Sequence, residues 1–358
     1  ERKENEVFIP LRFAPGQALQ IDWGEATVKL AGEKVKVNLF CARMSYSCAP
    51  YVIAYWRQNL ESFLDAIIHT LNYFGGVPRS MIFDNARVAV KSGFGAHAAA
   101  QDDYSKLAAH YGFQPVFCNP ASGNEKGLVE NLVGYIRRNV CVPLPQVDSL
   151  EDLNTKLLEQ CAKYMNHKID GRSQKVGQML AEDQAHLHPL PKYVLDISKK
   201  AYPKVNRYST VLFDTNYYSV PCKYRGKGTT VKAYPNRVEI WINGLLVATH
   251  DRCMGRKQES LDLRHYLPIL ERKGRAIRYA RPVLNAVPAE FLNWMEKQHL
   301  NSKQMVELLE QCLTDGYLAV MQRDLPNPDT SIAKNDVPVL SVDLSQYDKL
   351  YERKGAAS

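Results

Sequence analysis

The segment that decides the fold is ALQIDWGEATVKL, residues 18–30, in which apolar side chains recur at alternate positions. Alternation with a period of two is typical of a β-strand. A second such segment, VKVNLFCARM, follows at Val35–Met44 across a short turn, and a third, PYVIAYW, follows at Pro50–Trp56. These three segments predict an antiparallel meander near the start of the chain.

In the next hundred residues the spacing of the apolar side chains changes from that of a strand to that of a helix in several places. This change indicates helices inserted between further strands. Leu60–Phe74 carries apolar residues at helical spacing and stops at Gly75-Gly76. The later elements are predicted as a strand at Ser80–Phe83, a loop at 92–101, a helix at Asp103–Tyr111, a strand at Phe113–Phe117, a helix from Asn124 to about Val140, and a helix capped by Ser149. A meander that feeds α/β crossovers predicts a mixed α/β sheet with helices on its faces.

The second half of the chain has a different texture. Short strand-like runs dominate the region from Val205 to His250, and Asn243-Gly244 there is a strong hairpin signal. Two amphipathic helices are predicted at Pro288–His299 and Ser302–Leu318. The predicted domains are a linker remnant at 1–15, an α/β domain at 16–185, a linker at 186–204, a small basic β-barrel at 205–255, a helical C-terminal region at 256–325, and a flexible tail at 326–358.

Charge gives the first hint of function. The 358 residues sum to +8, yet Lys199–Arg281 holds 18 basic and 6 acidic residues, so that this stretch alone carries +12. A basic module beside a mildly acidic one suits a protein that binds a polyanion with one part and acts on it with another. A solvated lysine-rich surface explains the charge equally well.

Several classes of protein are disfavoured by composition. The eight cysteines form no C-x-x-C pair, which argues against a zinc or redox motif. No apolar run reaches the roughly 18 residues of a membrane span, and the chain begins Glu1-Arg2-Lys3 without an apolar signal region. We therefore expect a cytoplasmic protein without membrane contact. The chain also begins without methionine, so we expect an upstream segment.

Two aspartates stand where a sheet would present them to a ligand. Asp22 lies inside the first strand, where an unneutralised carboxylate is costly to bury. Asp84 ends the strand Ser80–Phe83, and ligands of open α/β sheets bind at the carboxyl ends of strands. Taken singly, either residue could be an edge carboxylate or the cap of a turn.

A third acid, Glu130, lies on the predicted helix that begins near Asn124. Lys126 and Arg137 share its helix face, which indicates either a site or a surface ladder of ion pairs. Glu125 and Glu25 are rival acids. Glu130 is preferred to Glu125 because G-x-V-E frames it and its neighbours share a basic face. Glu25 lies three residues after Asp22, and this odd offset points it to the opposite face of the strand.

Together the motifs are more specific than any one of them. The segments ALQIDWGEATV, GVPRSMIFDNARVAV and NEKGLVENLVGYIRRN resemble the IstA-type transposases, which belong to the superfamily of DDE transposases and retroviral integrases. The stretch from Asn206 to Arg252 resembles the β-barrel of that family, and HYLPILERKGRAIRYA resembles the segment after it. The resemblance covers about residues 10–285.

The resemblance implies a fold and a chemistry. It implies an RNase H-like mixed-sheet catalytic core at 16–185, followed by the small β-barrel and a helical C-terminal extension. It makes Asp22, Asp84 and Glu130 the catalytic, metal-binding triad for two Mg²⁺ ions, which Mn²⁺ could replace. The 46 positions between Asp84 and Glu130 are more than in retroviral integrases, so this part is expected to be expanded. The activity implied is 3′-end cleavage and strand transfer of an insertion sequence.

The partners implied are transposon-end DNA, target DNA, an IstB-type AAA+ ATPase helper and further copies of the chain in a dimer or tetramer, near a bacterial nucleoid. The missing upstream part would hold helix-turn-helix modules. Two other functions remain open: a stand-alone RNase H-like nuclease, and a catalytically inactive, domesticated transposase that only bridges DNA.

Basic residues supply the candidate DNA contacts. On and after the helix of Glu130 these are Lys126, Arg137 and Arg138, and in the barrel they are Lys223, Arg225, Lys227, Lys232 and Arg237. The barrel bases alternate with tyrosines, and such a mixture is typical of surfaces that neutralise phosphates and pack on sugars or bases. The tyrosines could equally form the barrel core, and Tyr218 and Tyr234 are expected there.

Overall fold

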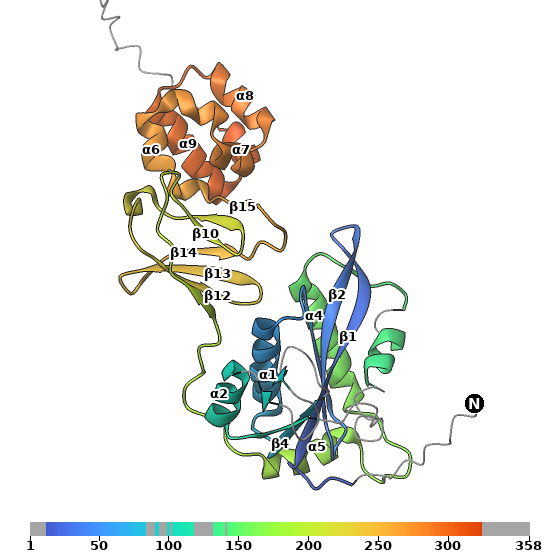
Figure 1. Cartoon of the computed structure of the whole chain (residues 1–358). Coiled ribbons are helices and arrows are strands. Elements are labelled where there is room, and N and C mark those ends of the chain that lie inside the picture. Colours follow the sequence, from blue (N-terminus) through green and yellow to red (C-terminus); the bar gives the residue numbers. More distant parts are fainter. Residues whose placement is uncertain are drawn as a thin grey trace, which may run out of the picture. The chain divides into compact units, whose positions relative to one another are not determined.

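The computed structural model of the chain describes residues 12–83, 90–92, 99–100, 102–117, 132–139 and 142–323. It divides into two compact units, residues 1–260 and 261–358. Figure 1 shows the large sheet with its helices, two smaller sheets, and the C-terminal helices. The prediction of a mixed α/β protein is confirmed.

The large sheet has the strand order β3-β2-β1-β4-β7. Strands β1 (Ala18–Leu30), β2 (Glu33–Met44) and β3 (Pro50–Tyr55) form the predicted antiparallel meander. On the other side of β1, strands β4 (Ser80–Phe83) and β7 (Gln114–Phe117) run parallel to it. The short strand β8 (Gln146–Val147) pairs with the far end of β1. Strand β1 is therefore the central strand.

Helices cover both faces of this sheet because each face is apolar. Leu19 and Ile21 of β1 belong to a core that includes α1 (Leu60–Phe74), α2 (Asp102–Tyr111) and α5 (Val176–His186). Ala26 and Val28 belong to a second core, packed against α4 (Leu150–Tyr164) and a helical segment at residues 132–139. The two cores follow from the alternation of side chains along a strand.

Local signals fix several helix ends. The side chain of Asn59 accepts a hydrogen bond from the Ser62 amide at the start of α1, and Gly75 ends that helix at φ 77°. Ser149 caps α4 in the same way, as its sequence predicted. The predicted loop at 92–101 was wrong in part, because β5 (Val90–Ser92) and β6 (Ala99–Ala100) pair as a small antiparallel sheet. Strands of two or three residues are too short to show an alternation in the sequence.

The basic part of the chain forms two small sheets around one core. A four-stranded sheet has the order β14-β13-β12-β9, and a three-stranded sheet has the order β10-β11-β15. Their bounds are β9 Lys199–Ala201, β10 Thr210–Phe213, β11 Asn216–Ser219, β12 Thr230–Ala233, β13 Arg237–Ile242, β14 Leu245–Asp251 and β15 Glu259–Ser260. Apolar side chains of both sheets, among them Val211, Tyr218 and Ile240, share one core. The hairpin at Asn243-Gly244 has both residues at positive φ, as predicted.

Strand β9 lies inside the segment predicted as a linker. Its Lys-Lys-Ala sequence pairs with β12 at the edge of the four-stranded sheet. A three-residue strand with two charged side chains has no apolar alternation, so the sequence did not reveal it. The domain boundaries as a whole stay a prediction.

A buried arginine links α1 to the small sheets within the first unit. The Arg252 side chain is 3% exposed, and its Nη2 lies 3.3 Å from Glu61 Oε1 and 3.5 Å from Asp214 Oδ2. Its Nη1 donates to the Tyr234 carbonyl at 3.0 Å. Because a buried charge is stable only when it is paired, this network constrains α1 and the ends of β10 and β14 together.

The C-terminal unit is helical. It comprises the 3₁₀ segments η3 (Leu263–His265) and η4 (Gly274–Tyr279) and the helices α6 (Leu267–Arg272), α7 (Arg281–Ala286), α8 (Ala289–Lys297), α9 (Ser302–Asp315) and α10 (Tyr317–Met321). Phe291, Leu309 and Val320 are among the fully enclosed residues of its own core. Across the described parts of both units, every helix is too short or too polar to span a membrane.

Candidate functional site

Asp22 is the one member of the predicted triad that falls within the described residues. It sits in β1 opposite Cys41 of β2 and is half-buried. The Trp23 amide donates a hydrogen bond of 2.8 Å to Asp22 Oδ1. Because Gly24 and Ala26 follow at even offsets, Asp22 faces the same side of the sheet as they do, toward the helical segment 132–139.

The neighbouring tryptophan fixes the orientation of the strand. The Trp23 ring points to the opposite face, where it meets Phe40 edge-on at 5.4 Å and Tyr55 at 6.2 Å between ring centroids. Edge-to-face aromatic pairs of this kind add to the energy of burial. With Trp23 anchored in one core, Asp22 is held on the other face of the sheet.

The end of β4 lies beside this position. Ile21 of β1 is the parallel register partner of Phe83 of β4. Each of these paired residues is followed in the sequence by an aspartate, Asp22 and Asp84. Asp84 itself lies outside the described residues.

The helical segment 132–139 packs tightly on β1 close to Asp22. A Cβ added to Gly24 would lie 2.6 Å from Val133 Cγ1, so only a glycine allows the observed approach. Leu132, Val133 and Ile136 are buried in the core below. Lys126, Glu130 and the rival Glu125 precede this segment and lie outside the described residues.

Arg137 and Arg138 are both exposed on this segment. Arg137 Nε donates to the carbonyl oxygen of Glu25 at 3.0 Å, which ties the helical segment to β1. Glu25 itself is exposed, and its odd offset from Asp22 places its side chain on the other face, as expected.

The structure reveals a buried arginine on the Asp22 face that the sequence reasoning missed. Arg43 of β2 is the register partner of Gln20, and its side chain is only 7% exposed. Arg43 Nη2 donates to the Tyr164 hydroxyl at 2.6 Å, and Arg43 Nε donates to the Cys48 carbonyl at 2.9 Å. The signal for this group was a single arginine inside the otherwise apolar run LFCARM. It brings a positive charge to the strand that pairs with β1.

The structure separates the predicted barrel bases into two sets. Lys232 Nζ lies 2.9 Å from Asp196 Oδ2, and Arg237 Nε lies 3.0 Å from Glu239 Oε1. The hydrogen bond that Lys232 donates to the Asp196 carboxylate raises the pKa of Lys232. Both bases are thus already paired within the protein. The other three bases, Lys223, Arg225 and Lys227, are exposed around the turn at Cys222–Tyr224.

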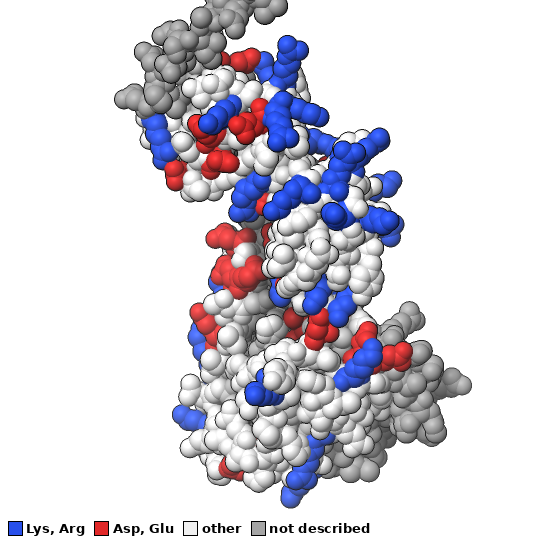
Figure 2. Space-filling view, turned by 90° about the vertical axis from the view of Figure 1, so that its left-hand side faces the viewer, with Lys and Arg blue, Asp and Glu red and all other residues white. Residues whose placement is uncertain are grey.

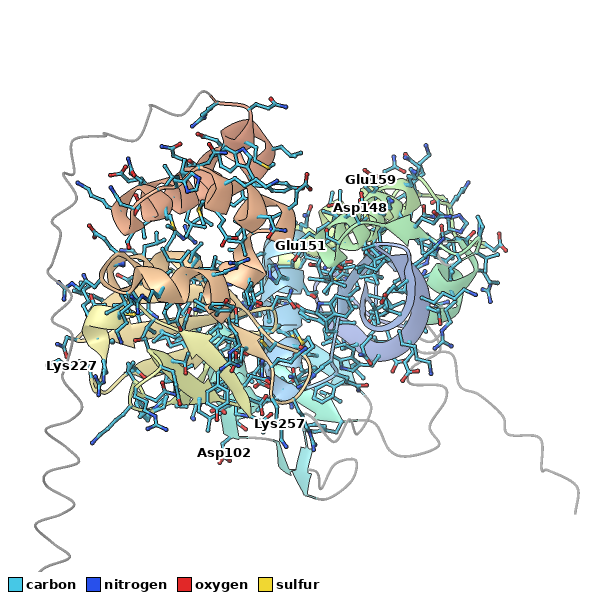
Figure 3. The ribbon with its side chains drawn as sticks, turned by 90° about the horizontal axis from the view of Figure 1, so that it is seen from above. Asp102, Asp148, Glu151, Glu159, Lys227 and Lys257 are labelled. Carbon is cyan, nitrogen blue, oxygen red and sulfur yellow. The ribbon has the colours of Figure 1, made fainter. Side chains whose placement is uncertain are left out.

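Figure 3 shows Lys227 at the outer edge of these sheets, pointing away from them. The tyrosines divide in a similar way. Tyr218 is fully buried, burial raises its pKa to about 12, and its hydroxyl accepts a hydrogen bond from the Cys253 amide at 3.0 Å. Tyr218 is therefore a core residue, as expected. Tyr217 is 36% exposed and Tyr208 is 62% exposed, so these rings are accessible from solution.

The metal-binding part of the prediction rests on carboxylate chemistry. Among residues 12–83, 90–92, 99–100, 102–117, 132–139 and 142–323, no three His, Cys, Asp or Glu side chains gather closely enough to hold a metal ion. Asp22 brings one carboxylate to this face, and the two other predicted ligands lie outside those ranges. A half-buried carboxylate on a central strand has the donor chemistry that Mg²⁺ prefers.

Comparison with known proteins gives a consistent result. A transposase of Aminobacter aminovorans is 33% identical over 328 residues, which cover 88% of this chain and 64% of that protein. The transposase of insertion sequence IS21 from Pseudomonas aeruginosa is 30% identical over 71% of this chain and 66% of its own length. The chain is similar over most of its length to insertion-sequence transposases of the IS21 type.

Two further matches concern parts of the chain. Residues 190–262 match the family model of the Mu transposase C-terminal domain, and this range contains all strands of the two small sheets. The catalytic core of HTLV-2 integrase, solved with magnesium, aligns with 47% of this chain and 97% of its own length at 16% identity and a TM-score of 0.35. The chain spans 64% and 66% of the length of the Aminobacter aminovorans and Pseudomonas aeruginosa transposases.

Proposed function

We propose that this chain carries the catalytic centre of a DNA transposase that cleaves the 3′ ends of an insertion sequence and transfers them to target DNA. The observation that carries the proposal is the pairing of Ile21 with Phe83, since an aspartate follows each of them. Adjacent parallel strands lie about 4.8 Å apart, which is a suitable separation for two carboxylates that share a metal ion.

The strand order supports the proposal that the core has an RNase H-like fold. Three antiparallel strands form one half of the large sheet, and two parallel strands extend it on the other side of β1. The candidate acids belong to β1, to the end of β4, and to the stretch before residues 132–139. In open α/β sheets, ligands generally bind at the carboxyl ends of the strands, beside the point where the strand order reverses. The proposed site has a location of this kind.

The position of Glu130 is supported by a neighbour. Val133 follows Glu130 by three positions, and Val133 touches Gly24, which follows Asp22 by two positions on the same face. On the helix predicted from Asn124 to about Val140, residues three apart share a side. This relation favours Glu130 over Glu125 as the third acid.

In the proposed mechanism Asp22, Asp84 and Glu130 would hold two Mg²⁺ ions, which Mn²⁺ could replace. Bound there, the metal would activate the attacking oxygen and stabilise the leaving 3′ oxygen. The protein's own part is to position these groups. The Trp23 amide orients the Asp22 carboxylate through its 2.8 Å hydrogen bond. Arg138, together with Lys126, supplies positive charge for the phosphate backbone.

The wider assembly is also part of the proposal. Lys223, Arg225 and Lys227 are exposed and suited to contacts with DNA phosphates. The partners proposed are transposon-end DNA, target DNA, an IstB-type AAA+ ATPase and further copies of this chain.

The test is a joining assay on a pre-cut transposon end in the presence of Mg²⁺. We expect Asp22→Asn, Asp84→Asn and Glu130→Gln each to lower strand transfer by at least about 100-fold, while binding of the same DNA is retained. Glu125→Gln is the matched control, and it should join at the rate of the unchanged protein.

The outcomes separate the alternatives. Cleavage without any joined product would support a nuclease, and DNA binding without metal-dependent cleavage would support an inactive bridging protein. Normal joining by Asp22→Asn would refute the proposed site.

A further inference from the structure

The C-terminal helical unit carries a concentration of positive charge that none of the predicted DNA contacts includes. Residues 263–281 contain six basic side chains and one acidic side chain, Glu271. The bases are Arg264, Arg272, Lys273, Arg275, Arg278 and Arg281, and all six are exposed. Figure 2 shows basic side chains projecting from the C-terminal helices.

The rest of the same unit has the opposite sign. Residues 289–315 contain five acidic and two basic side chains. The positive charge is therefore confined to the segment that runs from η3 through α6 and η4 to the start of α7, rather than spread over the whole unit. A confined patch of one sign is typical of a surface that binds a charged partner.

Two of the bases are already paired, and three are available. Arg264 contacts Asp262 through its guanidinium at 2.7 Å, and Arg278 pairs with Glu296. Arg272, Lys273 and Arg275 form no ion pair with any residue that the structure describes. A ligand can reach these three side chains without breaking an internal salt bridge.

The three available bases sit on a fixed turn. A Cβ added to Gly274 would lie 1.8 Å from Ser302 Oγ, so the backbone between Lys273 and Arg275 rests directly on the start of α9. The flanking residues Leu270 and Ile277 are buried in the core of the unit. Bases held on a rigid scaffold lose less conformational entropy when they bind than bases on a loose loop.

An exposed aromatic ring and a cavity lie beside the same turn. Tyr279 is 75% exposed. A cavity of about 420 Å³ is lined by Arg275, Arg278 and Tyr279 at its polar side, and by Ile277, Leu292 and Met295 among its apolar residues. Arginines beside an accessible aromatic ring can contact a phosphate and a sugar or base at the same time.

We infer that residues 272–279 form a DNA-backbone-binding surface on the C-terminal helical unit, separate from the catalytic face and from the small sheets. The inference rests on the proposed function, which supplies DNA as the polyanion. Phosphate contacts from Arg272, Lys273 and Arg275 bind without reading sequence. The role of this surface is to hold DNA at a second place on the chain while the catalytic face acts elsewhere.

The test compares two charge-matched double variants of the whole chain. Lys273→Gln with Arg275→Gln removes two charges from the surface, and Lys297→Gln with Lys303→Gln removes two exposed charges from the acidic part of the same unit. Binding of a fluorescent duplex is measured by anisotropy over a salt series in EDTA. Equal melting temperatures establish that both variants are folded.

A plot of the logarithm of the DNA association constant against the logarithm of the salt concentration has a negative slope. Each lost phosphate contact makes this slope less steep by about 0.9. We therefore expect Lys273→Gln with Arg275→Gln to make the slope less steep by about 1.8. The control double variant should leave the slope unchanged. Arg275→Lys, which keeps the charge, should also leave it unchanged. If both double variants bind like the unchanged chain, the inference is overturned, and the surface is left for a partner other than DNA.

This design also separates the inference from the function on which it rests. Because EDTA removes metal, binding is measured whether or not the catalytic site is active. A chain that binds no duplex at all would refute the proposed function, whereas a chain that binds with an unaltered slope in the first variant refutes only the second surface.

Discussion

Replacing Gly24 by alanine tests the link between β1 and the helical segment that follows the third candidate acid. The added Cβ would lie 2.6 Å from Val133 Cγ1, whereas carbon atoms in contact are ordinarily about 3.5–4.0 Å apart. The helical segment must therefore move away by about 1 Å. Overpacking of this kind costs about 1–3 kcal/mol in the free energy of unfolding.

The direction in which Gly24→Ala changes the free energy of unfolding is informative. Glycine inside a strand is about 0.5–1 kcal/mol less favourable than alanine for backbone entropy, so alanine would stabilise the protein if the space were open. We expect the opposite, a melting temperature lowered by about 2–4 °C for each kcal/mol. A displacement of about 1 Å in a catalytic constellation can cost about 100-fold in rate, and we expect strand transfer to fall by that order.

The assay pairs a thermal melt with Mg²⁺-dependent joining of a pre-cut DNA end. The control is the double variant Gly24→Ala with Val133→Ala, in which the clashing methyl group is absent. It should recover most of the joining rate lost in Gly24→Ala. If Gly24→Ala matches the unchanged protein in both measurements, or if the double variant joins no better than the single one, the packing argument is wrong.

Two further perturbations test the scaffold. Arg252→Ala leaves Glu61 buried without its partner, and we expect urea unfolding to show a loss of about 3–5 kcal/mol; adding Glu61→Gln should restore part of it, and additive losses would contradict the pairing. Asp183 is buried, and burial raises the pKa of its carboxyl despite hydrogen bonds from the amides of Gly16 and Ser47. A raised carboxyl pKa means that the folded state holds the proton more tightly, so the contribution of Asp183 to stability is fully present below pH 3.8 and is lost as the pH rises through the raised value. The free energy of unfolding of the unchanged protein relative to Asp183→Asn should therefore fall as the pH rises above about 4. Denaturation at several pH values measures this difference. A difference that stays constant with pH would contradict the prediction.

Much of the fold was predictable because its signals are local. The alternation in β1, β2 and β3, the spacing in α1, and the stop at Gly75 depend on residues a few positions apart. The same local reasoning placed Asp22 on one face of its strand and Glu25 on the other. Tyr218 was expected in a core, and it is fully buried.

The elements that escaped prediction are held by distant partners. Strand β9 has a charged, three-residue sequence that becomes a strand only by pairing with β12. The Asp183 carboxylate accepts hydrogen bonds from the amides of Gly16 and Ser47, which lie more than a hundred positions away in the sequence. Arg43 similarly finds Tyr164 across 121 positions. No local pattern in a single sequence carries such pairings.

The candidate site divides in the same way. The sequence predicted that Asp22 and Glu25 lie on opposite faces of the sheet, because strand alternation requires only a period of two. It could not supply the register of Ile21 with Phe83, which depends on how β1 and β4 meet. Nor could it predict that Gly24 lies within contact distance of Val133.

Strand β1 pairs with β2 along its whole length, with β4 near its start and with β8 near its end. The second edge of β1 is paired at Ala18–Ile21 and at Lys29–Leu30. Paired backbone between two apolar cores opens only with much of the domain, so the amides of these doubly paired stretches should exchange with solvent among the slowest in the chain. Asp22 is carried by that backbone. Under the proposed function the aspartate is a stationary reference point, to which each reacting DNA strand would have to be delivered in turn.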